Sequence, residues 1–99
     1  MKTNNNAKLE AITHKTLIVG IDIAKLTQWA RFVDYRGLEL GKAVKFKNDK
    51  NGFENILATI EWFCKTKSFD AVIVGLEPTG HYWKPLANYL LIHDVKVVG

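Results

Sequence analysis

Two short, almost purely aliphatic segments limit most strongly how this chain can fold. Residues 16–23 and 70–76 consist largely of Val, Ile, Leu, Ala and Gly. A carboxylate stands near the end of each: Asp22 lies within the first segment, and Glu77 directly follows the second. Apolar runs of this length are typical of strands buried on both faces at the centre of an α/β sheet. If the two strands lie parallel there, they bring Asp22 and Glu77 close together.

Residues 27–35 and 38–47 predict two further strands, joined by the turn at 34–37. In the second of them Lys45 and Lys47 alternate with apolar side chains, which indicates that one face is solvated. Because the connections are short, we expect these two strands and the first aliphatic strand to form an antiparallel meander.

The period then becomes helical. Apolar side chains at helical spacing from residue 53 to residue 64 predict an amphipathic helix. Asn51 and Glu54 have the spacing of a capping box, so the helix is expected to begin at Asn51 and end near Lys67. Residues 79–93 predict a second helix, in which Pro85 marks either a kink or the true first turn.

Residues 95–98 predict a fifth strand, which gives an α/β chain of order β-β-β-α-β-α-β. The length of 99 residues fits one small domain or part of a larger one. Residues 1–15 are expected to form a flexible arm, because they are polar, rich in Asn and without a clear period. They also lack the apolar core of a signal peptide.

Composition excludes several classes of protein. The formal net charge of +4 is compatible with a polyanionic partner. The single cysteine, Cys64, rules out an internal disulfide, is interpreted as a core residue, and has no zinc-ligand spacing with the three histidines. No apolar stretch approaches the ~20 residues of a membrane span. A soluble, cytoplasmic protein is therefore expected, with no membrane partner.

The two carboxylates are the main indication of function. A charge at the mouth of a buried strand is costly unless something compensates it, and a divalent cation shared by Asp22 and Glu77 is the simplest compensator. Carboxylates suit Mg²⁺ or Mn²⁺, and a pair of such ions supports phosphodiester chemistry. No third carboxylate is evident on a buried strand. The alternative is that both groups simply accept hydrogen bonds from strand-end amides.

Candidate nucleic-acid contacts lie near these motifs. Lys25 closely follows Asp22, and His81 and Lys84 follow Glu77. Other basic and aromatic side chains could bind phosphate or stack on bases, although a solvated strand face and core packing explain them as well. They are Lys42, Lys45, Lys47, Lys50, Trp29, Trp62 and Trp83.

The motifs Gly-Ile-Asp-Ile-Ala-Lys at 20–25 and Gly-Leu-Glu-Pro-Thr-Gly-His-Tyr-Trp at 75–83 resemble the N-terminal domain of the DEDD-type insertion-sequence transposases, a bacterial family that includes DNA invertases. The similarity extends over residues 16–99. It implies an RNase H-like, RuvC-type mixed five-stranded sheet that is C-terminally truncated here. It also implies that Asp22 and Glu77 are catalytic metal ligands, the first D and the E of a four-carboxylate site.

The family's two later aspartates and its C-terminal serine domain are absent from these 99 residues. The resemblance therefore implies a partial RuvC-like domain at 16–99 that does not bind Mg²⁺ or Mn²⁺ stably and does not cleave DNA alone. The complete protein is expected to cleave and transfer DNA strands during transposition, in some members with a structured guide RNA. An uncovered sheet edge predicts a homo-oligomer.

Two other functions remain open at the level of sequence. Actin-like and sugar-kinase ATPases also begin with Gly-Ile-Asp on a first strand, but they place a Gly/Thr-rich phosphate loop directly after it, where this chain has Ala24-Lys25-Leu26. A non-catalytic α/β module that only binds nucleic acid is the second alternative, and it would be indifferent to the loss of Asp22 and Glu77.

Overall fold

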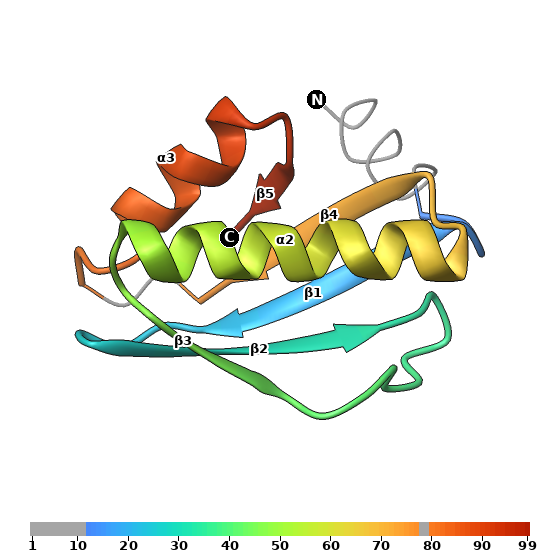
Figure 1. Ribbon diagram of the computed structural model, residues 1–99, viewed down its shortest axis with the longest axis horizontal. Coiled ribbons are helices and arrows are strands. Elements are labelled where there is room, and N and C mark those ends of the chain that lie inside the picture. The colour runs from blue at the N-terminus through green and yellow to red at the C-terminus, as the bar shows by residue number, and fades with distance from the viewer. Residues whose placement is uncertain (1–11, 78–79) are drawn as a thin grey trace.

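The two aliphatic segments form neighbouring strands at the centre of a five-stranded sheet (Figure 1). A computed structural model describes residues 12–77 and 80–99. Its elements follow the predicted order, and they are β1 (Thr16–Asp22), β2 (Thr27–Val33), β3 (Val44–Lys47), α2 (Lys50–Lys67), β4 (Ala71–Leu76), α3 (Lys84–Ile92) and β5 (Lys96–Val98).

The spatial order of the strands is β3-β2-β1-β4-β5. Strands β1, β2 and β3 pair antiparallel, which confirms the predicted meander, whereas β4 lies parallel to both β1 and β5. The β1–β4 register runs from Thr16 opposite Ala71 to Ile21 opposite Leu76. This mixed sheet is compatible with the RNase H-like fold that the resemblance implies.

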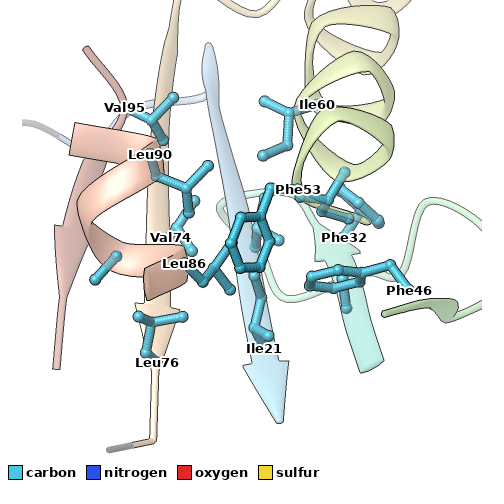
Figure 2. Close-up of a cluster of buried hydrophobic side chains, with 14 of the residues drawn as sticks. Ile21, Phe32, Phe46, Phe53, Ile60, Val74, Leu76, Leu86, Leu90 and Val95 are labelled. Atoms are coloured by element: carbon cyan, nitrogen blue, oxygen red, sulfur yellow. The ribbon is translucent and has the colours of Figure 1, made fainter. Parts of the chain in front are cut away.

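Both helices lie over the same face of the sheet (Figure 1). Figure 2 shows Phe53 of α2 and Leu86 of α3 packed above Ile21 of β1, in a core whose members are all buried. The rings of Phe32 on β2 and Phe63 on α2 stack with centroids 4.7 Å apart. Burial of such side chains contributes about 1.5–3 kcal/mol each.

The opposite face of the sheet is open. Along β1 the helix-facing side chains are buried, whereas Ile18 is half-buried and Gly20 and Asp22 are exposed. The prediction that the aliphatic strands are buried on both faces is therefore wrong toward their carboxyl ends, although Thr16 and Ile73, earlier on the same face, are buried. The aliphatic runs were misleading because they contain Gly20 and Gly75, which lie side by side on the open face. A glycine fits an apolar run in the sequence, but it has no side chain to bury.

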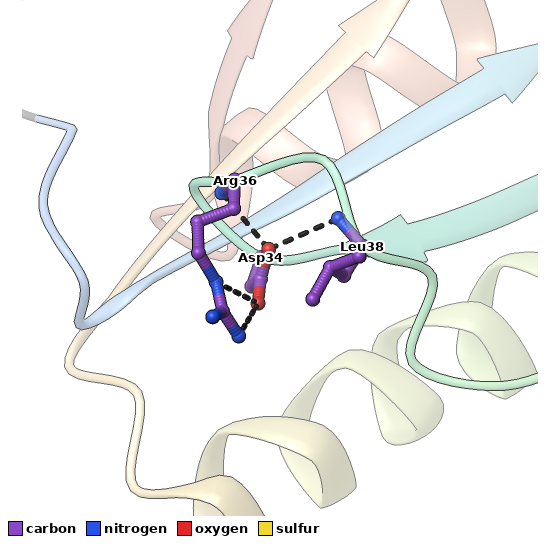
Figure 3. A network of polar contacts seen from close by, with 3 residues as sticks. All are labelled: Asp34, Arg36 and Leu38. Carbon is purple, nitrogen blue, oxygen red and sulfur yellow. Dashed lines mark hydrogen bonds and ion pairs between the residues drawn. The ribbon is translucent and has the colours of Figure 1, made fainter.

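The predicted third strand is too long. The turn at 34–37 is present, and the Asp34 carboxylate holds it by accepting hydrogen bonds from the main-chain N–H groups of Arg36 and Leu38 at 2.9 and 3.0 Å (Figure 3). The Arg36 guanidinium pairs with the same carboxylate at 3.1 Å. Beyond the turn only Glu39 bridges back to β2, and regular pairing resumes at Val44. The second strand likewise ends at Val33, before the predicted Tyr35.

Both helix starts also differ from the prediction. Helix α2 begins at Lys50, because the Asp49 side chain accepts a hydrogen bond from the Gly52 N–H at 2.8 Å and caps it. The predicted capping box at Asn51 is wrong. Helix α3 begins at Lys84, so Pro85 lies in its first turn, as one of the two alternatives predicted.

Residues 1–11 of the predicted arm lie outside the described residues. The segment that follows makes a turn in which the Thr13 N–H donates to the Thr16 hydroxyl at 2.9 Å, and the Lys15 carbonyl accepts from the Asp70 N–H just before β4. Neither α2 nor α3, the two helices of the described chain, has the length and apolar character needed to cross a bilayer.

Candidate active site

The parallel pairing of β1 and β4 brings the two carboxylates together. Asp22 is the last residue of β1, and Glu77 directly follows β4. Since Ile21 is in register with Leu76, the residues that come next, Asp22 and Glu77, stand beside each other at the carboxyl edge of the sheet. Both line one hollow of about 850 Å³ on the open face. The predicted juxtaposition is therefore present.

Both carboxylates are exposed, which corrects one premise of the sequence argument. Asp22 and Glu77 were expected to be buried charges in need of a compensator, but the open face leaves them in contact with solvent. Among the hydrogen bonds and ion pairs of the described residues, none involves either side chain. Within that part of the chain the alternative role, accepting hydrogen bonds from strand-end amides, is not seen, and the oxygens are available to a ligand.

Among the described residues, Asp22 and Glu77 are the carboxylates that line this hollow. The described residues contain no cluster of three or more His, Cys, Asp or Glu side chains that could enclose a metal. Asp70 lies at the opposite end of β4, and Asp94 lies in the turn before β5. A Mg²⁺ ion takes only one or two protein carboxylates and keeps several waters, so Asp22 and Glu77 fit a partly hydrated ion rather than a closed cage.

The candidate nucleic-acid contacts are all exposed and lie at the same edge of the sheet, two of them in loops and one at the start of a helix. Lys25 belongs to the loop between β1 and β2, His81 to the turn between β4 and α3, and Lys84 is the first residue of α3. The structure thus brings together residues that the sequence separates by more than fifty positions. Whether they contact a nucleic acid stays a prediction.

Asn48, which sequence reasoning missed, holds these two loops side by side. Its side-chain Nδ2 donates to the carbonyl of Lys25 at 3.2 Å and to the carbonyl of Tyr82 at 3.3 Å. Its main-chain N–H also donates to the carbonyl of Leu26 at 3.0 Å. Asn48 therefore ties the loop after Asp22 to the loop after Glu77. No local pattern could reveal this role, because one partner lies 23 residues before Asn48 and the other 34 after it.

The three tryptophans take different places. Trp29 on β2 is directly opposite Asp22 and lines the hollow. Trp62 lies on α2, where its ring meets Phe63 edge-on at 5.0 Å. Trp83 is half-buried before α3, and its Nε1 donates to the carbonyl of Gly80 at 3.1 Å. Only Trp29 among them shares a face with the carboxylates.

The fold and the site together define a class. A mixed sheet with an antiparallel hairpin on one side and parallel strands on the other, with carboxylates at the adjoining ends of its two central parallel strands, is an α/β domain of RNase H-like architecture. The sequence matches the family model of the DEDD transposases of the IS110 type, described as a transposase, over residues 19–99. The match spans most of the chain, and the chain belongs to this transposase family.

The family assignment confirms the resemblance drawn from the two motifs, and it removes the grounds for the sugar-kinase-type ATPase alternative. DNA is the partner that a transposase implies. No curated protein matches the sequence closely enough to count as a relative.

Proposed function

We propose that this chain supplies the first two carboxylates of a metal-dependent site that cleaves and transfers DNA strands during transposition. The observation that carries the proposal is the β1–β4 register, in which Asp22 and Glu77 adjoin at the carboxyl edge of two parallel strands. Membership of a transposase family supports the same reaction class.

Mg²⁺ or Mn²⁺ fits this pair of side chains. Asp22 and Glu77 offer hard oxygen donors that are exposed and have no hydrogen-bond or ion-pair partner among the described residues, and both line one hollow. A divalent ion held by these residues would supply Lewis-acid chemistry for a phosphodiester, lowering the pKa of a water nucleophile and neutralising charge on the leaving oxygen. The residues of this chain would bind and orient: the two carboxylates would hold the ion, Lys25 and Lys84 would neutralise backbone phosphates, and His81 would contact the same strand.

Two carboxylates are few for this chemistry, and the 99-residue chain is expected to hold its metal weakly and to leave DNA uncut. A nicking assay on supercoiled DNA in Mg²⁺ tests this point. Robust cleavage by the chain alone would contradict it. Binding of a guide RNA and formation of a homo-oligomer also stay predictions. Light scattering tests whether the chain forms a homo-oligomer.

The decisive experiment follows the metal directly. Paramagnetic Mn²⁺ titrated into the isotope-labelled chain should broaden the amide signals around Asp22 and Glu77 first. Asp22→Asn and Glu77→Gln should each remove this local broadening, whereas Asp70→Asn, an exposed carboxylate at the other end of β4, should preserve it. Broadening that is centred elsewhere, or that survives in both site variants, would refute the metal site.

In the complete transposase the same two substitutions should abolish recombination while the fold stays intact. Circular dichroism and thermal unfolding check the fold, and an excision or inversion assay checks the activity. Retained recombination in either variant would remove that residue from the catalytic role and would favour the alternative of a non-catalytic nucleic-acid-binding module.

A further inference from the structure

The hollow on the open face of the sheet has a bare floor. Gly20 and Gly75 lie opposite each other across the β1–β4 pair and line it from below. A Cβ atom added at Gly20 would meet nothing within 4 Å, and one at Gly75 would meet only the Val19 carbonyl oxygen at 3.9 Å. Neither glycine has the positive φ that would demand the absence of a side chain.

Neither the backbone nor neighbouring atoms therefore explain the two glycines. A glycine inside a strand is destabilising relative to alanine, because its backbone loses more conformational freedom on folding. Glycine inside a strand often marks a place where a ligand approaches the backbone closely. At Gly20 and Gly75 such a ligand would lie flat on the sheet, beside Asp22 and Glu77.

The wall of the hollow next to Asp22 is aromatic. Trp29 is 47% exposed although it stands in the middle of a strand. It is directly opposite Asp22 in an antiparallel pair, so the two Cβ atoms are about 4.5–5.5 Å apart. On its other side it is opposite Lys45 of β3, whose Nζ lies 5.8 Å from the centre of the indole ring.

Positive charge continues along this wall. Arg31 lies two residues beyond Trp29 on the same face and also lines the hollow. Its guanidinium pairs with Glu39 at 3.3 Å, but both side chains are more than half exposed. Such a surface ion pair contributes little to stability, because water and salt screen it, so Arg31 can exchange Glu39 for a phosphate at little cost.

We propose that this hollow binds a single DNA strand, with the ring of Trp29 stacked on one base and with Lys45 and Arg31 neutralising the adjoining phosphates. This inference rests on the proposed function for the choice of DNA. A flat aromatic surface flanked by cations is the combination that binds single strands without regard to sequence, because every base has a π-face. A duplex keeps its base faces stacked within itself and offers none to Trp29.

The stacked base fixes the strand relative to the carboxylates. Trp29 adjoins Asp22, and the glycine floor lets the nucleotide lie close to the sheet at the same point. The phosphate next to the stacked base is thereby held at the edge where Asp22 and Glu77 meet. Trp29 is a substrate-stacking residue, and it selects an unpaired strand at this position.

The test is the affinity of the 99-residue chain for a fluorescently labelled 12-mer of thymidine, measured by anisotropy in EDTA so that no metal is needed. Trp29→Ala should weaken binding about 5- to 150-fold, the loss that one stacked base gives. Trp62→Ala removes a more exposed indole on α2 and is the matched control, expected to bind within about twofold of the unchanged chain. Unchanged binding in Trp29→Ala, or an equal loss in both variants, would overturn the proposal.

A second variant tests the floor. Gly20→Val adds a β-branched side chain that fits the strand and meets no protein atom, so it should fold at least as stably and still bind the 12-mer much more weakly. Full binding by a folded Gly20→Val chain would overturn the proposal. Tighter binding of duplex DNA, or of the matching single-stranded RNA, would also overturn it.

The carboxylates separate this proposal from the proposed function. Asp22→Asn should abolish the local Mn²⁺ effect but retain or tighten binding of the 12-mer in EDTA, because it removes a negative charge next to the strand. If Mn²⁺ fails to bind while Trp29→Ala still loses the 12-mer, the metal site is wrong and the stacking site stands. If Mn²⁺ binds at Asp22 and Glu77 but Trp29→Ala still binds the 12-mer fully, the stacking site is wrong and the metal site stands.

Discussion

The substitution Gly52→Ala offers a sharp test of how α2 sits on the sheet. Gly52 lies in the first turn of α2 and is buried. A Cβ atom placed on it would overlap the carbonyl oxygen of Lys47 and would lie 2.7 and 2.8 Å from the Lys47 carbonyl carbon and nitrogen. These are backbone atoms at the end of β3, and they cannot rotate away. The helix can approach the strand this closely only because residue 52 has no side chain.

Two effects oppose each other at this position. Replacing glycine by alanine in a helix normally stabilises it by about 1 kcal/mol. Relieving the overlap requires α2 to move off β3, and overpacking of this kind costs about 1–3 kcal/mol. The movement also disturbs the hydrogen bond from the Gly52 N–H to Asp49, a cap worth ~1 kcal/mol. The net expectation is a loss of about 1–3 kcal/mol in the free energy of unfolding.

Urea and thermal unfolding, followed by circular dichroism, measure this loss. A loss of about 2 kcal/mol lowers the Tm of a domain of this size by roughly 8–16 °C. Asn51→Ala is the matched control, because Asn51 is exposed in the same turn and its replacement should stabilise the helix by a few tenths of a kcal/mol. A Gly52→Ala chain as stable as the unchanged one would refute the close approach of α2 to β3.

Three further predictions concern other parts of the chain. Asn48→Ala should lower the free energy of unfolding by about 1 kcal/mol and speed hydrogen exchange in the two loops that Asn48 connects. Asn48→Asp should lower it further, because its carboxylate would face two carbonyl oxygens. Equal hydrogen exchange in the unchanged chain and both variants would argue against this connection. Burial alone would raise the pKa of Asp34, but the hydrogen bonds of its turn and the Arg36 guanidinium hold the pKa below 3.8. Because the pKa of Asp34 is lower in the folded state than in the unfolded state, the stabilisation is present above pH 3.8 and is lost as the pH falls through the folded-state pKa. The free energies of unfolding of the unchanged chain and of Asp34→Asn, measured in urea, should therefore become equal in strong acid. Burial raises the pKa of the Cys64 thiol above 9.0, so iodoacetamide should modify it more slowly than free cysteine at pH 8, and an equal rate would contradict that environment.

Sequence patterns predicted the parts of the fold that depend on side-chain periodicity. The aliphatic runs located β1 and β4, and the helical spacing of apolar residues located α2. Boundaries were less predictable where two residues could serve the same purpose. Asp49 and Asn51 are both good capping residues, and the folded chain uses the earlier one, whose side chain accepts a hydrogen bond from the Gly52 N–H.

The candidate site was predictable for its carboxylates and not for its surroundings. Asp22 and Glu77 each follow an aliphatic strand, so parallel pairing of the strands was enough to bring them together. The exposure of both groups depends on which face the helices cover, and no single segment encodes that choice. The tie made by Asn48 depends on loops that meet only in the folded chain.

The pairing of β1 with β4 also determines when the site comes into being. Only a short loop separates β1 from its antiparallel partner β2. Its parallel partner β4 begins at Ala71, which pairs with Thr16 and lies 55 positions further along the chain. Closing so long a loop is slow compared with forming a hairpin. A ribosome that has released only the meander and α2 has produced Asp22 without Glu77, so the two carboxylates adjoin at the edge of the sheet only after the fourth strand has docked.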